Sequence, residues 1–333
     1  MHSLYEGPCR RYRKPTKCQR CGKYKRVLCD INGELVCLDC LRGIAFYKVL
    51  REGFRDPRIR GDILKVSMDV ASLVWGNPIA RAWLWPLVLW FYSRDIGMEL
   101  TIEVLERSWR FKPPLEEVFR LYMEERIFNV VEEGGKRILV EGEALQEMLQ
   151  KYRDRSDLYD IVTNWAFGFI IARLHEEPSA PDFRYVYAVL KSIGGMITED
   201  GKVKAEPYYR VTGYRCKLCG KKTDTREEMR RHLMRDHLVP TDEMHEHIEV
   251  EKEVVGYLLE VHDLIKSARR EYIRPEYLIE RIEKGGAVVN HDPDIPRFIE
   301  KDGRHYLIVS PAWIRVLIRT REYERELTRG RFR

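Results

Sequence analysis

The sequence is poor in the side-chain amides of Asn and Gln. Only eight occur in 333 residues, namely Asn32, Asn77, Asn129, Asn164, Asn290, Gln19, Gln146 and Gln150. Charged residues make up 34% of the chain instead. Hyperthermophilic proteins show this bias, because the desolvation cost of ion pairs falls on heating and amides are heat-labile. The composition indicates a hyperthermophilic, archaeal source, with a mesophilic protein of unusual composition as the alternative.

The sequence also lacks an apolar run long enough to cross a bilayer. Its longest such stretch, Ala82–Tyr92, is short and contains Pro86. The basic N-terminus has no apolar segment of a secretory signal. We therefore expect a cytoplasmic protein, nucleoid-associated if it binds DNA, with no membrane partner. Paired cysteines there indicate metal, although a disulfide stays open for Cys9 and Cys29, because hyperthermophilic archaea tolerate cytosolic disulfides.

Signatures of catalysis are missing too. There is no Gly-rich loop that would cradle phosphates, no nucleophile elbow, and no spacing that would gather carboxylates on one metal. The clusters His245–His247 and His291–Asp294 are more simply interpreted as charged loops. The sequence therefore predicts a protein that is not an enzyme.

Two Cys-x2-Cys pairs lie near the N-terminus with fifteen residues between them: Cys18, Cys21, Cys37 and Cys40. Four thiolates at this spacing can close a tetrahedron around one zinc ion. A site with four protein ligands has no open position, so we expect a structural role. A redox Cys-x2-Cys is the alternative, and the second pair argues against it.

The residues between and after these pairs indicate how the site is built. Asn32-Gly33 predicts a tight turn between two strands, and the residues after Cys40 have helical spacing. A knuckle, a hairpin and two ligands at a helix start resemble the treble-clef zinc fingers over residues 16 to 53. That resemblance implies a small module that depends on its metal.

Basic residues surround this site, and no acid lies between positions 10 and 26. The predicted nucleic-acid contacts here are Arg10, Arg11, Arg13, Lys14, Lys17, Arg20, Lys23, Lys25 and Arg26. Such clustering is typical of phosphate binding, and Tyr12 and Tyr24 offer stacking faces. The alternative is a solvated terminal arm.

A second motif has the spacing Cys-x2-Cys-x12-His-x4-His, with the ligands Cys216, Cys219, His232 and His237. It resembles the Cys2His2 zinc-finger family, which implies a second zinc ion. The family places two core hydrophobes near Thr223 and Met229, and only Met229 fits.

The same family reads bases from positions −1, 3 and 6 of its helix. These correspond to Thr225, Glu228 and Arg231, of which Arg231 suits guanine. Other cations suited to the phosphate backbone complete the predicted contacts on this finger: Lys221, Lys222, Arg226 and Arg230. A finger with a structural or protein-binding role is the alternative.

Residues 60–155 follow the order of a winged helix. Thr101 is a good N-cap, Pro113-Pro114 opens a third helix, and two short strands flank a Gly-Gly turn. The order resembles the winged helix-turn-helix family, whose third helix commonly enters the major groove. Here that helix is acidic, so the predicted contacts are Lys136 and Arg137 of the wing, or a protein partner binds instead. A generic small α/β fold is the alternative.

Residues 250–333 repeat part of this plan. A helix is expected over Pro275–Lys284, then a hairpin with its turn at 301–304, then a helix from Pro311. A basic tail is expected after the last helix. The helix itself is expected to expose four cations: Arg315, Arg319, Arg321 and Arg325. We interpret this segment as a second winged helix.

The predicted fold class is α+β and mostly helical. The expected units are a basic arm and four-cysteine finger (1–55), a winged helix (60–155), a helical and hairpin connection (156–210), an embedded Cys2His2 finger (211–240) and the second winged helix (250–333). The predicted function is a non-enzymatic, zinc-dependent DNA-binding protein, such as a transcription regulator or a replication or chromatin factor. The alternatives are an RNA-binding or ribosome-associated zinc protein and a protein-interaction scaffold.

Overall fold

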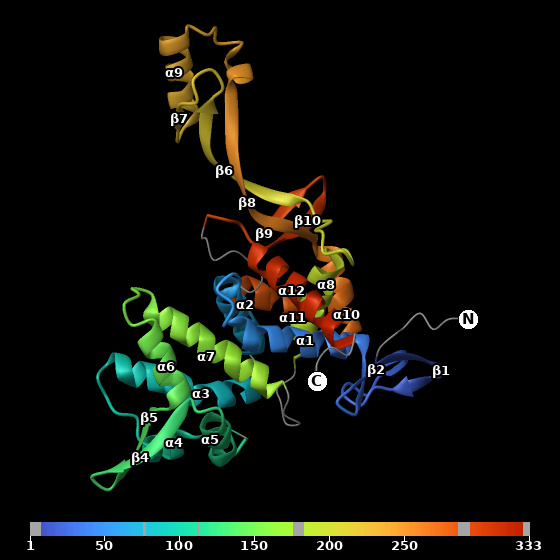
Figure 1. Cartoon of the computed structure of the whole chain (residues 1–333), viewed down its shortest axis with the longest axis vertical. Helices are drawn as coiled ribbons and strands as arrows, with labels where there is room; N and C mark the ends of the chain where they lie inside the picture. The colour runs from blue at the N-terminus through green and yellow to red at the C-terminus, as the bar shows by residue number, and fades with distance from the viewer. Residues whose placement is uncertain (1–7, 76–77, 112, 176–182, 286–293, 329–333) are drawn as a thin grey trace.

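The computed structural model describes the chain except residues 1–7, 76–77, 112, 176–182, 286–293 and 329–333. Helices and small sheets alternate along it, and a narrow two-stranded extension projects from the helical body (Figure 1). Within the described residues, no helix is long and apolar enough to span a membrane. The predicted basic tail at 329–333 lies outside the described residues.

The N-terminal module is a three-stranded sheet followed by a helix. Its elements are β1 (Cys9–Lys17), β2 (Tyr24–Ile31), β3 (Glu34–Cys37) and α1 (Leu38–Gly53), with the strands in the order β1-β2-β3. Asn32 and Gly33 turn the chain between β2 and β3 with φ of 54° and 87°, as the hairpin prediction requires.

The segment expected to be a basic arm is instead the strand β1, paired antiparallel with β2. Cys9 lies directly opposite Cys29, and the two form a disulfide. Between Arg11 and Thr16 the register shifts, so Tyr12–Pro15 bulges outward opposite Arg26. The prediction of an arm is therefore wrong, because this segment is a strand that is paired with β2 and tied to it by the disulfide.

The first helical unit contains the helix after Thr101, the helix opened by Pro113-Pro114 and the two strands around the Gly-Gly turn, in the predicted order. Its elements are α2 (Arg60–Trp75), α3 (Pro78–Asp95), α4 (Ile102–Ser108), α5 (Leu115–Glu124), β4 (Phe128–Glu133), β5 (Lys136–Glu141) and α6 (Glu143–Lys151). Thr101 caps α4, because its hydroxyl accepts a hydrogen bond from the Val104 amide. Thr101 also bridges to Ile138 of β5, so the order across this small sheet is Thr101, β5, β4.

The second helical unit repeats this plan and begins further upstream than residue 250. Its elements are α8 (Arg184–Gly195), β8 (Ile248–Glu260), α10 (Val261–Arg270), α11 (Pro275–Gly285), β9 (Phe298–Lys301), β10 (Arg304–Val309) and α12 (Pro311–Thr328). The strands pair in the order β8-β10-β9, which matches Thr101-β5-β4. The two units therefore share one topology. The helix α7 (Leu158–Leu174) connects them.

The two units and α1 share a single core. Trp313 of α12 is completely buried, stacks on Phe46 of α1 with ring centroids 5.8 Å apart, and donates its indole N–H to Asp69 of α2 at 2.7 Å. Trp83 and Trp90 are also buried, at 3% and 6% exposure.

The expectation of an exposed, basic last helix is wrong for Arg321. Its guanidinium donates to the carbonyls of Gly194, Ile197 and Thr198 at the end of α8. Arg315 of the same helix pairs with Asp62 of α2 at 2.7 Å. Because α12 packs on the body, these two cations link it to α2 and to the end of α8.

The Cys2His2 segment lies at the far end of a β-ribbon (Figure 1). The ribbon consists of β6 (Pro207–Cys216) and β8, and between them are inserted β7 (Lys222–Thr223), α9 (Arg226–His237) and the 3-10 turn η1 (Met244–His247). Strand β8 continues into the body, where it pairs with β10. One face of the ribbon is linked by ion pairs such as Arg215–Glu249 at 3.0 Å. The finger is thus an insertion that the ribbon holds away from the body.

A buried histidine joins the N-terminal module to the body and generates a pH prediction. His175, at the end of α7, stacks on Tyr47 at 4.1 Å, and its carbonyl accepts from Arg20 at 2.9 Å. Burial, with a smaller contribution from the Arg20 charge, lowers the pKa of His175 from 6.5 to about 3. The folded protein therefore holds this ring neutral where the unfolded chain would protonate it.

We expect His175 to destabilise the fold as pH falls from 6.5 towards 3, because only the unfolded chain takes up its proton there. Its contribution is fully present above pH 6.5 and has a slope of at most ~1.4 kcal/mol per pH unit. The variant His175→Phe keeps a ring on Tyr47 and should flatten the free energy of unfolding against pH in that window. The exposed control His262→Phe should keep the wild-type slope, and an unchanged slope in His175→Phe would refute the assignment.

Candidate metal centres

The four N-terminal cysteines converge as their spacing predicted. Their sulfur atoms all lie within 4.8 Å of one another, with Cys18–Cys40 at 3.8 Å and Cys21–Cys37 at 3.7 Å. A tetrahedral zinc with Zn–S bonds near 2.3 Å places its sulfurs about 3.8 Å apart, so the cluster has the size of a four-thiolate site. Cys37 is the N-cap of α1 and Cys40 lies in its first turn.

The electrostatics of this cluster favour a bound cation. Hydrogen bonding from the Cys40 thiol lowers the pKa of Cys37 to about 5, whereas burial raises the pKa of Cys21 to about 11. Donation of its proton to Cys37, together with burial, raises the pKa of Cys40 far above its usual range. Without a cation, repulsion therefore confines the cluster to few thiolates. A divalent metal supplies the charge that lets all four ionise.

The second ligand group converges as well. The ligand atoms of Cys216, Cys219, His232 and His237 lie within 4.8 Å of one another. The Cys219 sulfur is 3.2 Å from Nε2 of His232. Nε2 of His237 is buried without a hydrogen-bond partner in the described structure. A nitrogen left without a partner beside two sulfurs fits a metal ligand.

Both sites use the same backbone turn, which the spacing alone did not reveal. In each, the residues after the second cysteine are Gly-Lys, and the glycine adopts a left-handed conformation: Gly22 with φ of 70° and Gly220 with φ of 77°. Each glycine amide donates to the carbonyl of the first cysteine, at 2.9 Å and 2.8 Å. The repeated Cys-x2-Cys-Gly-Lys sequence is the signal that could have identified these glycines, since left-handed φ favours Gly.

Asp236 is a second residue that the motif did not identify. Its carboxylate lies 2.7 Å from Nδ1 of His232, so it accepts that N–H and leaves Nε2 for a metal. Contacts with Arg235 and then His232 lower the pKa of Asp236, so it is ionised near neutral pH. The signal was its position four residues after His232 on one helix face.

The small core of the finger explains how it tolerates Thr223. Met229 is completely buried as expected, and residues beyond the predicted limit at 240 pack beside it: Met244 and Ile248, at 1% and 8% exposure. Side chains from η1 and the start of β8 therefore supply apolar contacts that the family usually takes from position 223. The finger and its ribbon form one folded piece.

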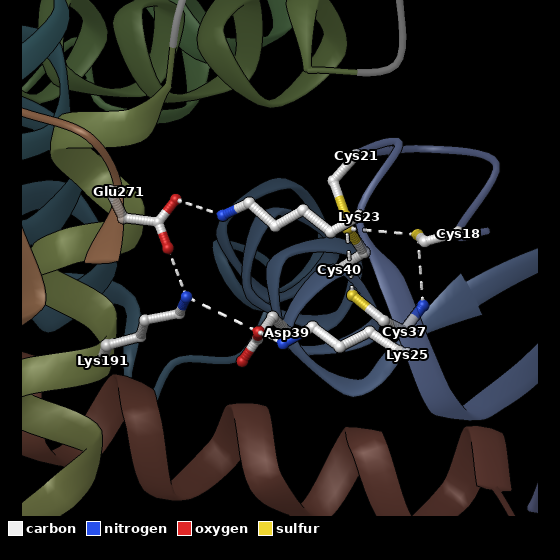
Figure 2. Close-up of polar contacts among 9 residues, drawn as sticks. All are labelled: Cys18, Cys21, Lys23, Lys25, Cys37, Asp39, Cys40, Lys191 and Glu271. Atoms are coloured by element: carbon white, nitrogen blue, oxygen red, sulfur yellow. Dashed lines mark hydrogen bonds and ion pairs between the residues drawn. The ribbon is translucent and has the colours of Figure 1, made fainter. Parts of the chain in front are cut away.

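The four-cysteine site is docked on the body through a chain of charges (Figure 2). Lys23, in the turn after Cys21, lies 3.5 Å from Glu271, and the buried Glu271 also binds Lys191. Lys191 and Lys25 each lie 3.5 Å from Asp39, between the ligands Cys37 and Cys40. Charges from the sheet and the second unit therefore alternate in sign across this contact.

This docking changes the interpretation of three predicted nucleic-acid contacts. Lys23 and Lys25 bind carboxylates within the chain, and Arg20 donates to His175 and lies 3.9 Å from Glu34. In this structure these three cations hold the four-cysteine module against the body. The other predicted cations of β1 and β2 are exposed and form no ion pair with a described acid: Arg10, Arg11, Arg13, Lys14, Lys17 and Arg26.

The predicted contacts on the finger and wing divide in the same way. Lys222 pairs with Glu251 at 2.7 Å, Lys221 lies 3.9 Å from Asp236, and Arg137 binds Glu103 and Glu106 of α4. Lys136 is exposed. Three arginines of α9 are exposed and form no ion pair with any described residue: Arg226, Arg230 and Arg231.

Comparisons with known proteins give no relative. No family model matches the chain, and neither a curated protein nor a solved structure is significantly similar to it.

We expect purified protein to carry two zinc ions per chain, measured by elemental analysis. Cys219→Ser should lower this to one and leave the thermal unfolding of the body unchanged, because the finger lies at the end of the ribbon. Cys37→Ser should also lower it to one but reduce the midpoint of unfolding, because the four-cysteine module is docked on the body through Arg20 and Lys23. Equal midpoints for the two variants would contradict this division.

Removing the carboxylate that orients His232 should weaken the second site. Asp236→Ala is expected to lower zinc affinity there by roughly 10- to 100-fold, measured by competition with a chromophoric chelator. Asp224→Ala, on the same finger but away from the ligands, is the matched control. Wild-type affinity in Asp236→Ala would show that the hydrogen bond is incidental.

Proposed function

We propose that this chain is a zinc protein that binds DNA without catalysing a reaction, and that the finger at the end of the ribbon makes the principal contact. Zinc is the metal that fits, because both sites are closed sets of four sulfur and nitrogen ligands at tetrahedral spacing. DNA is favoured over RNA because the finger resembles a family that places its helix in the major groove of duplex DNA.

The observation that carries the proposal is the exposure of α9. Its buried side chains are Met229, His232 and Leu233, on the face towards the zinc site and β6. Arg226, Arg230 and Arg231 point away from this small core, exposed and without an acidic partner among the described residues. Unpaired arginines on a helix held clear of the body can reach phosphates without first breaking ion pairs.

A groove on α9 that includes Arg231, but neither Arg226 nor Arg230, indicates how a base edge would be met. It has a volume of about 710 Å³ and is lined by Glu228 and Arg231, at positions 3 and 6 of the helix, together with Lys221 and Arg235. Arg231 suits guanine and Glu228 suits the cytosine amino group. One finger reads about three base pairs, so the expected sequence preference is modest.

We further propose that both helical units are winged helices that serve as scaffolds. The support is their shared order of helices and strands, including the bridge from Thr101 to β5. Their third helices, α5 and α11, expose acids such as Glu116, Glu124, Glu276 and Glu280. Phosphate would be repelled there, so these faces suit a basic protein surface better than DNA.

Replacing the three unpaired arginines should test the finger. Arg226→Ala/Arg230→Ala/Arg231→Ala is expected to lower affinity for a duplex at least ~10-fold at low salt, and to reduce the log–log salt slope from roughly −4 or −5 by about 2.7 units. Fluorescence anisotropy of labelled duplex DNA over a salt series measures both.

The matched control is Arg55→Ala/Lys65→Ala/Arg81→Ala, which removes three exposed cations of the body. It should keep the wild-type slope. Competition with structured RNA is the third arm. The proposal is wrong if both triple variants bind duplex DNA alike, or if structured RNA displaces the duplex at far lower concentration than unlabelled DNA does.

A further inference from the structure

A cluster of cations and an exposed tyrosine lies at the junction of the four-cysteine module and the second helical unit, beside the docking contact between Lys23 and Glu271. Residues 266–275, at the end of α10 and before α11, hold four cations and one acid, Glu271. That acid is buried at 5% exposure and binds Lys23 and Lys191. The four cations are exposed and form no ion pair with a described residue: Lys266, Arg269, Arg270 and Arg274.

Tyr272 is at the centre of this cluster and is 77% exposed. Its backbone ends α10 with φ of 57°: the Tyr272 amide donates to the Arg269 carbonyl, and the Ile273 amide to that of Ala268. Glycine is the usual residue at this left-handed position, because it has no Cβ. Arg126 and Leu238 adopt the same conformation after α5 and α9, so conformation alone is not the signal. The signal is an exposed tyrosine in the same segment as Lys266, Arg269 and Arg270, which form no ion pair with a described residue, and Arg274, whose guanidinium lies 5.8 Å from the centre of the Tyr277 ring.

The zinc module contributes to the same surface. The Lys23 ammonium lies 5.4 Å from the centre of the Tyr272 ring, and the same ammonium forms an ion pair with Glu271. The Lys23 carbonyl accepts from the Cys18 amide at 2.9 Å, so the metal turn fixes where Lys23 begins. Figure 2 shows Lys23 reaching from the cysteine cluster to Glu271.

The basic strand β1 continues this surface. A β-carbon on Gly22 would lie 3.7 Å from Cε of Lys17, so the Lys17 side chain runs along the turn that carries Lys23. Lys17 pairs across the sheet with Tyr24, a residue that is 68% exposed. Cations and two open tyrosine rings therefore follow one another from the β1–β2 sheet to the end of α10.

We propose that this surface, the Tyr272 platform (Lys23, Arg269, Arg270, Tyr272 and Arg274), binds single-stranded nucleic acid, with a base stacked on Tyr272 and phosphates on the arginines. In a duplex the base faces are stacked on one another and cannot stack on an exposed ring. A single strand offers both a free base face and phosphates. The platform is separate from the finger, because α10 belongs to the body and the ribbon holds α9 away from it (Figure 1). This is a second binding site, and it rests on the proposed function only in that both sites bind nucleic acid.

The test uses the full-length zinc-loaded chain and anisotropy of labelled oligothymidine and oligouridine of roughly twelve nucleotides. Tyr272→Gly removes the ring and places the favoured residue at the left-handed position, so its thermal midpoint should equal or exceed that of wild type. Affinity for single strands should fall about 5-fold or more. Tyr272→Phe keeps the ring and should bind like wild type. The two oligonucleotides show whether the strand is DNA or RNA.

The charge requirement has its own variant. Arg269→Ala/Arg270→Ala/Arg274→Ala should reduce the salt slope for single strands by about 2 units, while the body triple variant at Arg55, Lys65 and Arg81 leaves it unchanged. Wild-type affinity in Tyr272→Gly would overturn the proposal. Equal losses in Tyr272→Phe and Tyr272→Gly would overturn stacking, and displacement by polyglutamate as readily as by oligothymidine would show a site for acidic peptides instead.

Duplex binding distinguishes this failure from failure of the proposed function. The affinity of Tyr272→Gly for duplex DNA should stay within about 2-fold of wild type. The finger triple variant should lose affinity for duplex DNA and keep its affinity for single strands. If the finger variant loses nothing while Tyr272→Gly loses single strands, the finger proposal fails and the platform stands. The opposite pattern leaves the finger and removes the platform.

Discussion

Four thiols gather at the N-terminal end of α1, and the helix that begins there packs in the centre of the molecule. Burial raises the pKa of Cys21, and a hydrogen bond from Cys40 lowers that of Cys37, so without a cation the cluster holds few thiolates. A divalent metal lets all four ionise and fixes the turn that carries Arg20 and Lys23. Through those two residues the site reaches His175 and Glu271. The small sheet, the first helix and the second helical unit are thus held together around one centre.

The features that the sequence could predict are local ones. Ligand spacing identified both metal sites, the Asn32-Gly33 turn and the Thr101 cap occur where expected, and the order α4, α5, β4, β5 follows from helix breakers and hydrophobic period. Each depends on residues within one short segment of the chain, whose turns, caps and periodicity can be read from the sequence. Asp236 was equally local and was missed because the motif does not require it.

What the sequence could not provide depends on partners far along the chain. The pairing of β6 with β8 spans the whole finger, and Glu271 meets Lys23 across most of the sequence. A run of cations such as Arg20 to Arg26 has the same pattern whether it faces phosphate or a buried carboxylate. Only the fold separates the paired lysines of the docking contact from the unpaired arginines of α9 and of the Tyr272 platform.

The ribbon has a geometric consequence for the finger that it carries. Its pairing shifts register twice, between Tyr208 and Tyr209 and between Val211 and Gly213. Each irregularity bends the strand and increases its right-handed twist. The direction in which α9 faces is therefore set in part by two points on β6, between its start at the body and the ligand Cys216 at its end. Evolution could re-aim the finger by inserting or deleting one residue there, with both ends of the molecule left intact.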